Sequence, residues 1–296
     1  MAARGTDRNM LPFNPLRRIE RSIRLVRDAV LVRPASTMWA VRREVSKQYP
    51  MLVQDFGDHR MAFNPNDDPI GRTILQHGSW HRPQFENILA SLRDIGRITD
   101  PKIFLDVGAN IGTQTIYALA SGAFSRVIAI EPDDANARTL QMNALLNGFE
   151  DRVDIVRAAA GAEMGTLYLN ANTTNSGGHK VTNTPNGGKS VPVKVVTIES
   201  VLRNRRLDPA DLGLVWIDVE GFEAEAVAGM SPVVERAIPL CIEFNAHVYG
   251  RIKSREFFSY LAEHYAVAAI VSDRQIEFRP IAELCTPERT VDILFA

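Results

Sequence analysis

The sequence predicts an α/β fold built around a mostly parallel sheet, on three observations. Residues 103–107 form a short apolar run, typical of a strand that is buried on both faces. A glycine-containing turn and a helical pattern from Thr113 to Leu119 follow it directly. A second apolar run, Val127 to Ile130, ends at an acid, Glu131. This order of strand, turn, helix, strand and acid is the local build of a nucleotide-type binding site.

The turn after the first strand contains residues suited to a bound ligand. Asp106 interrupts the strand near its end, where a buried carboxylate needs a charged or hydrogen-bonding partner. Gly108 and Gly112 let the backbone approach a ligand closely, and the first turn of the helix leaves N–H groups free. The spacing is Gly-x-x-x-Gly and not Gly-x-Gly-x-x-Gly, which argues against a cradle for a dinucleotide pyrophosphate.

Glu131 ends the second strand 25 residues after Asp106, and Pro132 stops that strand. An acid in this place can accept hydrogen bonds from both hydroxyls of a ribose. Two acids beside one pocket favour a cationic ligand over a phosphate. S-adenosylmethionine carries a sulfonium, an ammonium and a ribose but no phosphate, so the pattern indicates this cofactor. The alternative is an ordinary strand–helix–strand turn with a solvated acid.

Five sequence blocks follow one another in a characteristic order. They are Asp106-Val-Gly-Ala-Asn-Ile-Gly112, Ile130-Glu-Pro-Asp133, Asn143-Ala-Leu-Leu-Asn147, Val191-Pro-Val-Lys-Val-Val-Thr-Ile198 and Ile217-Asp-Val-Glu-Gly-Phe-Glu223. From about Ile70 to the C-terminus, the chain resembles the FkbM family of S-adenosylmethionine-dependent methyltransferases, within the Rossmann-like class I superfamily. The last block is the most family-specific. The resemblance implies a doubly wound, seven-stranded, mostly parallel sheet whose last strand is antiparallel.

The resemblance also implies which residues hold S-adenosylmethionine. Many members of the superfamily place an acid after the third strand, predicted here over residues 152–160, to bind the adenine amino group. This chain reads Arg157-Ala-Ala-Ala-Gly161 there, so the backbone near Ala159 would have to serve. The other cofactor-binding residues that we expect are Asp106, Gly108, Asn110, Gly112, Glu131, Pro132 and Asp218.

Asp218 and Glu220 follow the predicted fourth strand, residues 212–217. In a parallel sheet they come to the same edge as Asp106 and Glu131. Methyl transfer is a direct displacement that depends on alignment, and a hydroxyl acceptor becomes more nucleophilic when a base removes its proton. Asp218 or Glu220 could be that base. Alternatively, Asp218 caps the following helix and Glu220 makes a structural bond.

An acid, an amide and an imidazole lie at the end of the fifth predicted strand, residues 239–244. They are Glu243, Asn245 and His247. His247 could be the general base, and Glu243 and Asn245 could contact the substrate. Alternatively, Asp218, Glu243 and Asn245 could hold a divalent cation that lowers the pKa of the acceptor oxygen. Ordinary loop packing is the third reading, and we predict no metal.

A long polar loop, residues 170–190, joins two predicted strands over residues 167–169 and 191–196. A loop of this length within a compact domain is often a lid or a binding loop. It contains His179, a candidate for substrate binding or proton transfer, although a lone histidine beside glycines is usually inert.

The N-terminal part of the chain is expected to extend the methyltransferase domain. Residues 51–64 suggest a hairpin, and the turn-rich stretch that ends at Pro69 predicts an edge between an extension of residues 1–69 and a domain of residues 70–296. In the resembled family the region after this edge packs over the cofactor pocket. Trp80, His81 and Arg82 could therefore line it.

Basic charge is concentrated in the first fifty residues, which contain eleven Lys or Arg against four Asp or Glu. Within residues 15–32, apolar side chains recur at helical spacing opposite arginines, which predicts a basic amphipathic helix. This helix could pack on the catalytic domain, dock on a second copy in a homo-oligomer, or lie on an anionic membrane.

The composition fits a cytoplasmic enzyme. A chain of 296 residues that is 45% hydrophobic can bury a full core, and a net charge of −1 gives no strong field for nucleic acid. Two cysteines exclude a disulfide framework and a Cys-rich metal site. No apolar run is long enough to span a bilayer.

We therefore expect an O-methyltransferase that acts on a hydroxyl of a small molecule or glycan unit, an acceptor class implied by the resemblance. Two alternatives stay open. One is a cofactor-binding module without turnover, tethered by its basic N-terminus, against which Asp218, Glu220 and the long loop argue. The other is an N-methyltransferase, but no Pro-Pro-Tyr-type clamp follows the fourth strand.

Overall fold

The computed structural model describes residue 44 and residues 48–172, 175–185, 190–272, 276–283 and 290–296. Residues 51–296 form one compact unit, which contains the fold described below. The predicted basic helix of residues 15–32 lies outside the described residues. Among those described, no helix combines the length and the apolar character that crossing a bilayer requires.

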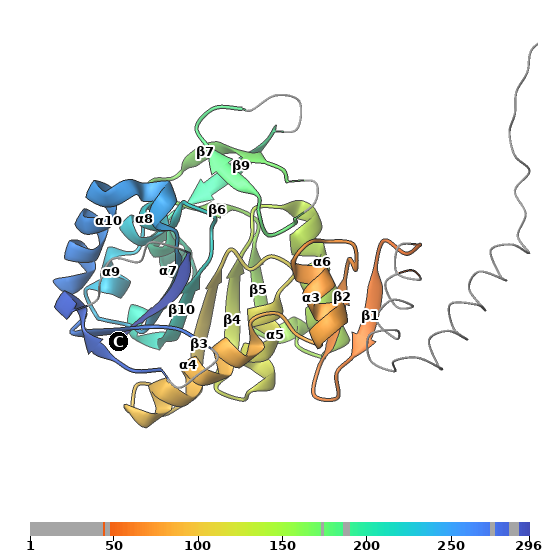
Figure 1. The fold of residues 1–296 in the computed structure, drawn as a ribbon, viewed down its shortest axis with the longest axis horizontal. Coiled ribbons are helices and arrows are strands. Elements are labelled where there is room, and N and C mark those ends of the chain that lie inside the picture. The colour runs from red at the N-terminus through yellow and green to blue at the C-terminus, as the bar shows by residue number, and fades with distance from the viewer. Residues whose placement is uncertain (1–43, 45–47, 173–174, 186–189, 273–275, 284–289) are drawn as a thin grey trace, which may run out of the picture. The chain divides into compact units, whose positions relative to one another are not determined.

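A mostly parallel sheet forms the centre of this unit (Figure 1), and its strand order is β13-β12-β14-β11-β10-β3-β4-β5. The expected seven-stranded sheet with an antiparallel last strand, β14, is confirmed, and the two-residue β13 is added at one edge. The strand bounds are β3 (Lys102–Val107), β4 (Phe124–Ile130), β5 (Val153–Val156), β10 (Leu212–Ile217), β11 (Leu240–Phe244), β12 (Val267–Ile270), β13 (Arg279–Pro280) and β14 (Val291–Phe295).

The chain runs outward from β3 through β4 to β5 and then returns to β10, on the other side of β3. Such a reversal of strand order opens a crevice at the carboxyl ends of the two central strands, which is where open α/β sheets bind ligands. The topology therefore places the ends of β3, β4, β10 and β11 around one site.

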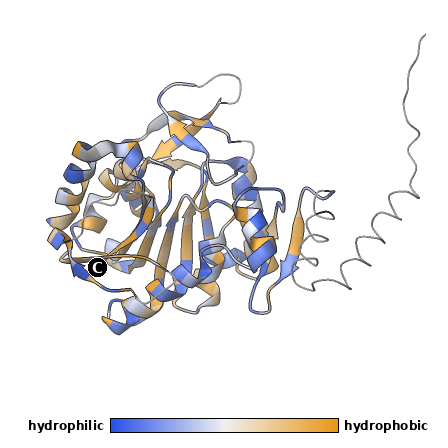
Figure 2. Cartoon of the chain, in the orientation of Figure 1, coloured by the Kyte–Doolittle hydropathy of each residue, from blue (hydrophilic) through white to orange (hydrophobic). Residues whose placement is uncertain are grey.

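Helices cover both faces of this sheet, which explains why its central strands are apolar along their length (Figure 2). One hydrophobic cluster joins one face to α7, α8, α9 and α10, and a second joins the other face to α4, α5 and α6. The bounds are α4 (Arg82–Asp94), α5 (Thr113–Ala120), α6 (Asp134–Leu146), α7 (Ile198–Arg205), α8 (Glu223–Ala228), α9 (Ser231–Val234) and α10 (Ala246–Ala262).

A separate four-stranded sheet, with the order β6-β9-β7-β8, differs from the sequence prediction. Its strands are β6 (Ala159–Ala160), β7 (Gly165–Asn170), β8 (Lys180–Thr182) and β9 (Ser190–Val196). The predicted third strand ends early, at Val156, because the chain turns and its last alanines pair with β9. The predicted loop also contains a strand, β8, which is short and has no apolar run to reveal it.

The predicted hairpin is confirmed as β1 (Leu52–Asp55) and β2 (Arg60–Phe63), and it packs beside α3 (Ile70–His77). Two asparagines of the third sequence block hold it to α6. The Asn143 side chain accepts a hydrogen bond from the Ala62 N–H at 2.6 Å, and the Asn147 amide donates to the Arg60 carbonyl at 2.7 Å. This block therefore has a structural role, and the predicted domain edge after residue 69 stays a prediction.

We predict that Gly108→Ala strongly destabilises the protein. Gly108 has a φ of 82°, and a Cβ there would lie 1.8 Å from the Asp218 carbonyl oxygen, so backbone would have to move. The expected loss in the free energy of unfolding is about 2 kcal/mol or more, measured by urea denaturation.

Gly148→Ala is the matched control for this substitution. Gly148 has a φ of 67° with nothing within 4 Å of an added Cβ, so this variant carries only the backbone strain. Equal losses in the two variants would show that the contact between Gly108 and Asp218 is unimportant.

Candidate functional site

A cavity of about 490 Å³ opens where β3, β4 and β10 end. Its wall combines backbone of the glycine turn, two acidic regions and an apolar patch. The lining residues are Gly108, Asn110, Ile130, Glu131, Pro132, Asn136, Ala158, Ala159, Ala160, Leu169, Ser176, Gly177, His179, Val181, Asp218, Val219, Glu220 and Phe222.

Glu131 fixes the floor of this cavity. Its two carboxylate oxygens accept the backbone N–H groups of Asn110 and Asp133, each at 2.8 Å. Asn110 has a φ of 51°, which turns its N–H toward this acid. Burial raises the pKa of Glu131 to about 7. The carboxylate therefore joins the turn after β3 to the start of α6, and it lines the cavity at the same time.

One side of the cavity is apolar and suits a flat ring. Ala158 lies between β5 and β6, Ala159 lies in β6, Leu169 in β7, and Phe222 in the loop after β10. The second sheet thus forms part of this wall, whereas from the sequence we expected only the backbone near Ala159 to contribute. Phe222 and Leu169 gave no signal in the sequence, since both look like ordinary core residues.

The polar loop before β8 covers this cavity. Ser176 donates from its backbone N–H and its hydroxyl to the two oxygens of Asp67, at 2.7 and 2.6 Å. Its carbonyl accepts the side-chain amide of Asn136 at 3.1 Å. His179 Nδ1 accepts the Asn172 N–H at 3.0 Å, and its Nε2 lies 4.0 Å from an Asp133 oxygen. His179 is therefore held by the loop while it lines the cavity.

A second cavity, of about 790 Å³, shares part of this wall and extends toward β11. Trp80 and His81, with ring centroids 4.3 Å apart, line it as the resemblance suggested. Arg82 instead pairs with Asp58 at 2.5 Å. The other lining residues are Pro69, Ile70, Gly108, Asn110, Ile111, Thr113, Gln114, Asn175, Gly177, Trp216, Asp218, Glu220 and Glu243.

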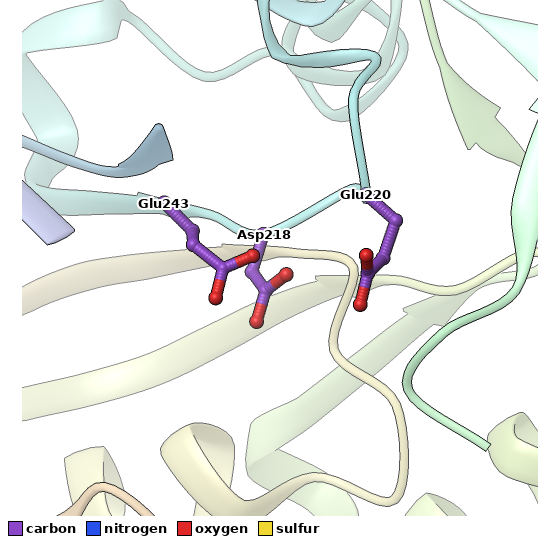
Figure 3. Close-up of side chains that lie close together, drawn as sticks. All are labelled: Asp218, Glu220 and Glu243. Atoms are coloured by element: carbon purple, nitrogen blue, oxygen red, sulfur yellow. The ribbon is translucent and has the colours of Figure 1, made fainter. Parts of the chain in front are cut away.

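Three carboxylates meet in this second cavity (Figure 3). Asp218, Glu220 and Glu243 each have an oxygen within 4.8 Å of the others, and the groups turn to the same side of the sheet edge. Asp292 adds a fourth acid, because it is the register partner of Glu243 on the neighbouring β14. The parallel register of β10 and β11 thus brings Asp218, just after β10, beside Glu243, near the end of β11.

Burial and mutual repulsion make these acids hold their protons more tightly than usual. Burial, followed by the charges of Glu243 and Glu220, raises the pKa of Asp218 well above its ordinary range. Burial and then Asp292 raise the pKa of Glu243 to about 7. The pKa of Glu220 is raised by burial as well, although Lys180 opposes this. Glu243 can therefore exchange a proton near neutral pH.

The spacing of the three carboxylates would also admit a cation, but the set that we considered from the sequence is not assembled. Asn245 accepts the His247 N–H at 3.1 Å and caps α10, so its carbonyl is already used. We assign no metal to this cluster.

The predicted site residues fall into three groups. Eight of them line the first cavity, Glu243 lines the second, and four line neither. The eight are Gly108, Asn110, Glu131, Pro132, Ala159, His179, Asp218 and Glu220. The four are Asp106, Gly112, Asn245 and His247.

Local packing explains these four positions. The Asp106 carboxyl is buried and accepts the Thr115 hydroxyl at 2.5 Å. Gly112 leaves room for Leu140 of α6, whose Cγ would lie 2.8 Å from an added Cβ. His247 is exposed in the first turn of α10, which Asn245 caps.

The capping reading for Asp218 is wrong. The helix that follows, α8, begins at Glu223 and its N-cap is Phe222, so Asp218 is too far from the helix to cap it. Asp218 is instead free to face both cavities.

Residues 106–269 match the sequence model of the methyltransferase FkbM domain, which is more than half of the chain. The chain belongs to the FkbM methyltransferase family. It is a methyltransferase, and its cofactor is S-adenosylmethionine. No curated protein sequence matches it.

Solved structures with a similar arrangement include several methyltransferases. An O-methyltransferase from Bacillus cereus in complex with SAH is 10% identical, with a TM-score of 0.41 and coverage of 92% of this chain and 96% of that one. Cofactor-bound Rv0187 from MTB is 14% identical, with a TM-score of 0.40 and coverage of 92% and 95%. The C-terminal domain of precorrin-6Y C5,15-methyltransferase from Rhodobacter capsulatus is 12% identical, with a TM-score of 0.37 and coverage of 70% and 85%.

The residues of the first cavity fit S-adenosylmethionine. The apolar wall suits adenine, and Glu131 is an acceptor for ribose hydroxyls. The open face of Gly108 lets the methionine part approach the backbone, and the acids near Asp218 suit a sulfonium and an ammonium. Among the described residues, those that line the two cavities include no Lys or Arg.

We predict that Glu131→Ala weakens S-adenosylmethionine binding by about 1–3 kcal/mol, because charged hydrogen bonds to the ribose are lost. Titration calorimetry measures this directly. Glu163→Ala removes an exposed acid and is the control. Glu131 also holds two loops, and the loss of that support weakens the binding of any form of the cofactor. The analogue 2′-deoxy-S-adenosylhomocysteine lacks one of the ribose hydroxyls, so the substitution should weaken its binding less. Unchanged affinity for S-adenosylmethionine would show that Glu131 does not bind the ribose.

Proposed function

We propose that the protein transfers the methyl group of S-adenosylmethionine to a hydroxyl of a small molecule or glycan unit. The observation that carries this proposal is the cluster of Asp218, Glu220 and Glu243 in the second cavity, which adjoins the cofactor cavity. The cofactor supplies an electrophilic methyl. What the chain must supply is alignment and a group that accepts the hydroxyl proton.

Asp218 and Glu243 are the best candidates for that group. Asp218 lines both cavities and therefore lies where donor and acceptor would meet. Glu243 lies beside it, and the two share a site in which both cannot easily be charged. One carboxylate of the pair could take the proton while the other, still protonated, donates a hydrogen bond to the acceptor oxygen. His247 is exposed and lines neither cavity, which argues against its being the base.

The charge of the cleft supports a neutral or cationic acceptor over a nucleic acid. The cavity walls within the described part of the chain contain acids, amides and two histidines but no Lys or Arg. A polyanion would meet repulsion there. Transfer to nitrogen is disfavoured for a different reason: the residues after β10 are Asp-Val-Glu-Gly, which offer no Pro-Pro-Tyr-type amide clamp.

Labelled methionine tests the proposed function. Cells that produce the wild-type protein or Asp218→Asn are fed methionine with a deuterated methyl group, and their metabolites and glycans are compared by mass spectrometry. We expect a labelled methyl ether that is absent with Asp218→Asn. A label that fragmentation places on nitrogen or on RNA would contradict the proposal.

The pH dependence of transfer follows from the raised pKa values. A carboxyl whose pKa is raised keeps its proton to a higher pH, so the base form is scarce in acid and accumulates as the pH rises. We predict that kcat/KM for the acceptor identified by the labelling experiment rises with pH. It should level off above about 7, the pKa of Glu243. Asp218→Asn should lose about 100-fold or more.

Asp151→Asn, which changes an exposed acid, is the control and should match the wild type. A rate independent of pH between 5 and 8 would exclude this pair as the base. A rate that falls in excess chelator would instead point to a metal at the same carboxylates.

A further inference from the structure

The loop after β10 is held in a strained conformation. Glu220 and Gly221 have φ values of 53° and 98°, in the left-handed region. For a residue with a side chain, such as Glu220, this backbone costs on the order of 1 kcal/mol and persists only where surrounding contacts impose it. The same loop carries Asp218 and Glu220 into the cleft, so the contacts that hold it also set the geometry of the acids.

Glu223 supplies one of these contacts. Its side chain is buried, and its Oε1 accepts the N–H of Gly221 at 2.9 Å. Its Oε2 accepts the Tyr249 hydroxyl at 2.6 Å, and that hydroxyl oxygen accepts the Ala224 N–H at 3.1 Å. Three hydrogen bonds thus connect the loop, the start of α8 and the start of α10.

The ring of Tyr249 is itself fixed by stacking. Its centroid lies 5.5 Å from that of Phe244 with an interplanar angle of 8°, and 6.2 Å from that of Phe257 with an angle of 3°. Phe244 directly follows Glu243 on β11. The neighbouring Val248 packs against Gly221, since an added Cβ there would lie 2.8 Å from its Cγ1. Tyr249 therefore ties the loop after β10 to the end of β11.

We propose that Tyr249 and Glu223 form a brace that positions Glu220 in the cleft beside Asp218 and Glu243. Neither member of the brace lines the two cavities, so both act through Glu220. They are positioning residues. The importance of Glu220 rests on the proposed function, but the contacts of the brace do not depend on which acceptor is methylated.

Tyr249→Phe tests the brace, because it removes the hydroxyl and keeps the stacked ring. Carbon-13 NMR of labelled carboxyl groups follows the titration of Glu220, which is assigned with Glu220→Gln. Glu220 faces Lys180, Glu223 and the acids of the cluster, and none of these residues is replaced in the variant. The lost hydroxyl also raises the pKa of Glu223, so the exchange of the Gly221 amide is the readout that reports the loop itself. A released Glu220 turns toward water, so its titration should move down by about half a pH unit or more. The Gly221 amide should exchange about tenfold faster.

Tyr260→Phe is the matched control. It removes a hydroxyl from the part of α10 beyond the kink at Gly250, at a residue whose ring contacts His264, and both readouts should match the wild type. A folded Tyr249→Phe with an unchanged Glu220 titration would overturn the proposal. A Tyr249→Phe variant that fails to fold would also overturn it, because the hydroxyl would then stabilise the whole protein and not the loop alone. Neither readout requires a methyl acceptor. These measurements therefore test the brace independently of the proposed O-methylation.

Discussion

The structure depends on the close approach of two loops at the reversal of strand order. Gly108, at the end of β3, lies against the Asp218 carbonyl so closely that a methyl group would not fit between them. The Asp218 N–H donates to the Val107 carbonyl at 3.0 Å, and the Gly108 N–H donates to the Ile130 carbonyl at 2.9 Å. The ends of β3, β4 and β10 are thereby joined through backbone, with no side chain between them. The acids that follow these strands must then face one small volume.

Concentrating acids in a half-buried cleft has two consequences that serve the same reaction. A sulfonium cofactor is attracted to negative charge, while a phosphate is repelled. Burial and repulsion also raise the pKa of Asp218 well above its ordinary range and that of Glu243 to about 7, so that Glu243 can exchange its proton near neutral pH. Spreading the same acids over an exposed surface would lose both effects, because water would screen the charges and restore ordinary titration.

Much of the fold could be predicted because its strands are apolar runs and its turns contain glycine. β10 has the predicted bounds, α5 ends one residue after the predicted helical pattern, and the hairpin, the acids after β10 and Glu243 near the end of β11 lie where periodicity and topology placed them. The second sheet was missed because β8 is three residues long and polar, so only its pairing with β7 defines it. Asp106 and Gly112 looked like ligand contacts, yet side chains of α5 and α6 occupy the space that they face. Such choices depend on tertiary packing, which a local pattern does not contain.

The most direct measurement is a crystal structure with bound S-adenosylhomocysteine, because the account depends on where the cofactor's sulfur lies. The account predicts the ribose hydroxyls on Glu131, the adenine between Ala159 and Phe222, and the sulfur facing the wall that Asp218 shares between the two cavities. A ribose out of reach of Glu131, or a sulfur that points away from Asp218 and Glu243, would contradict it.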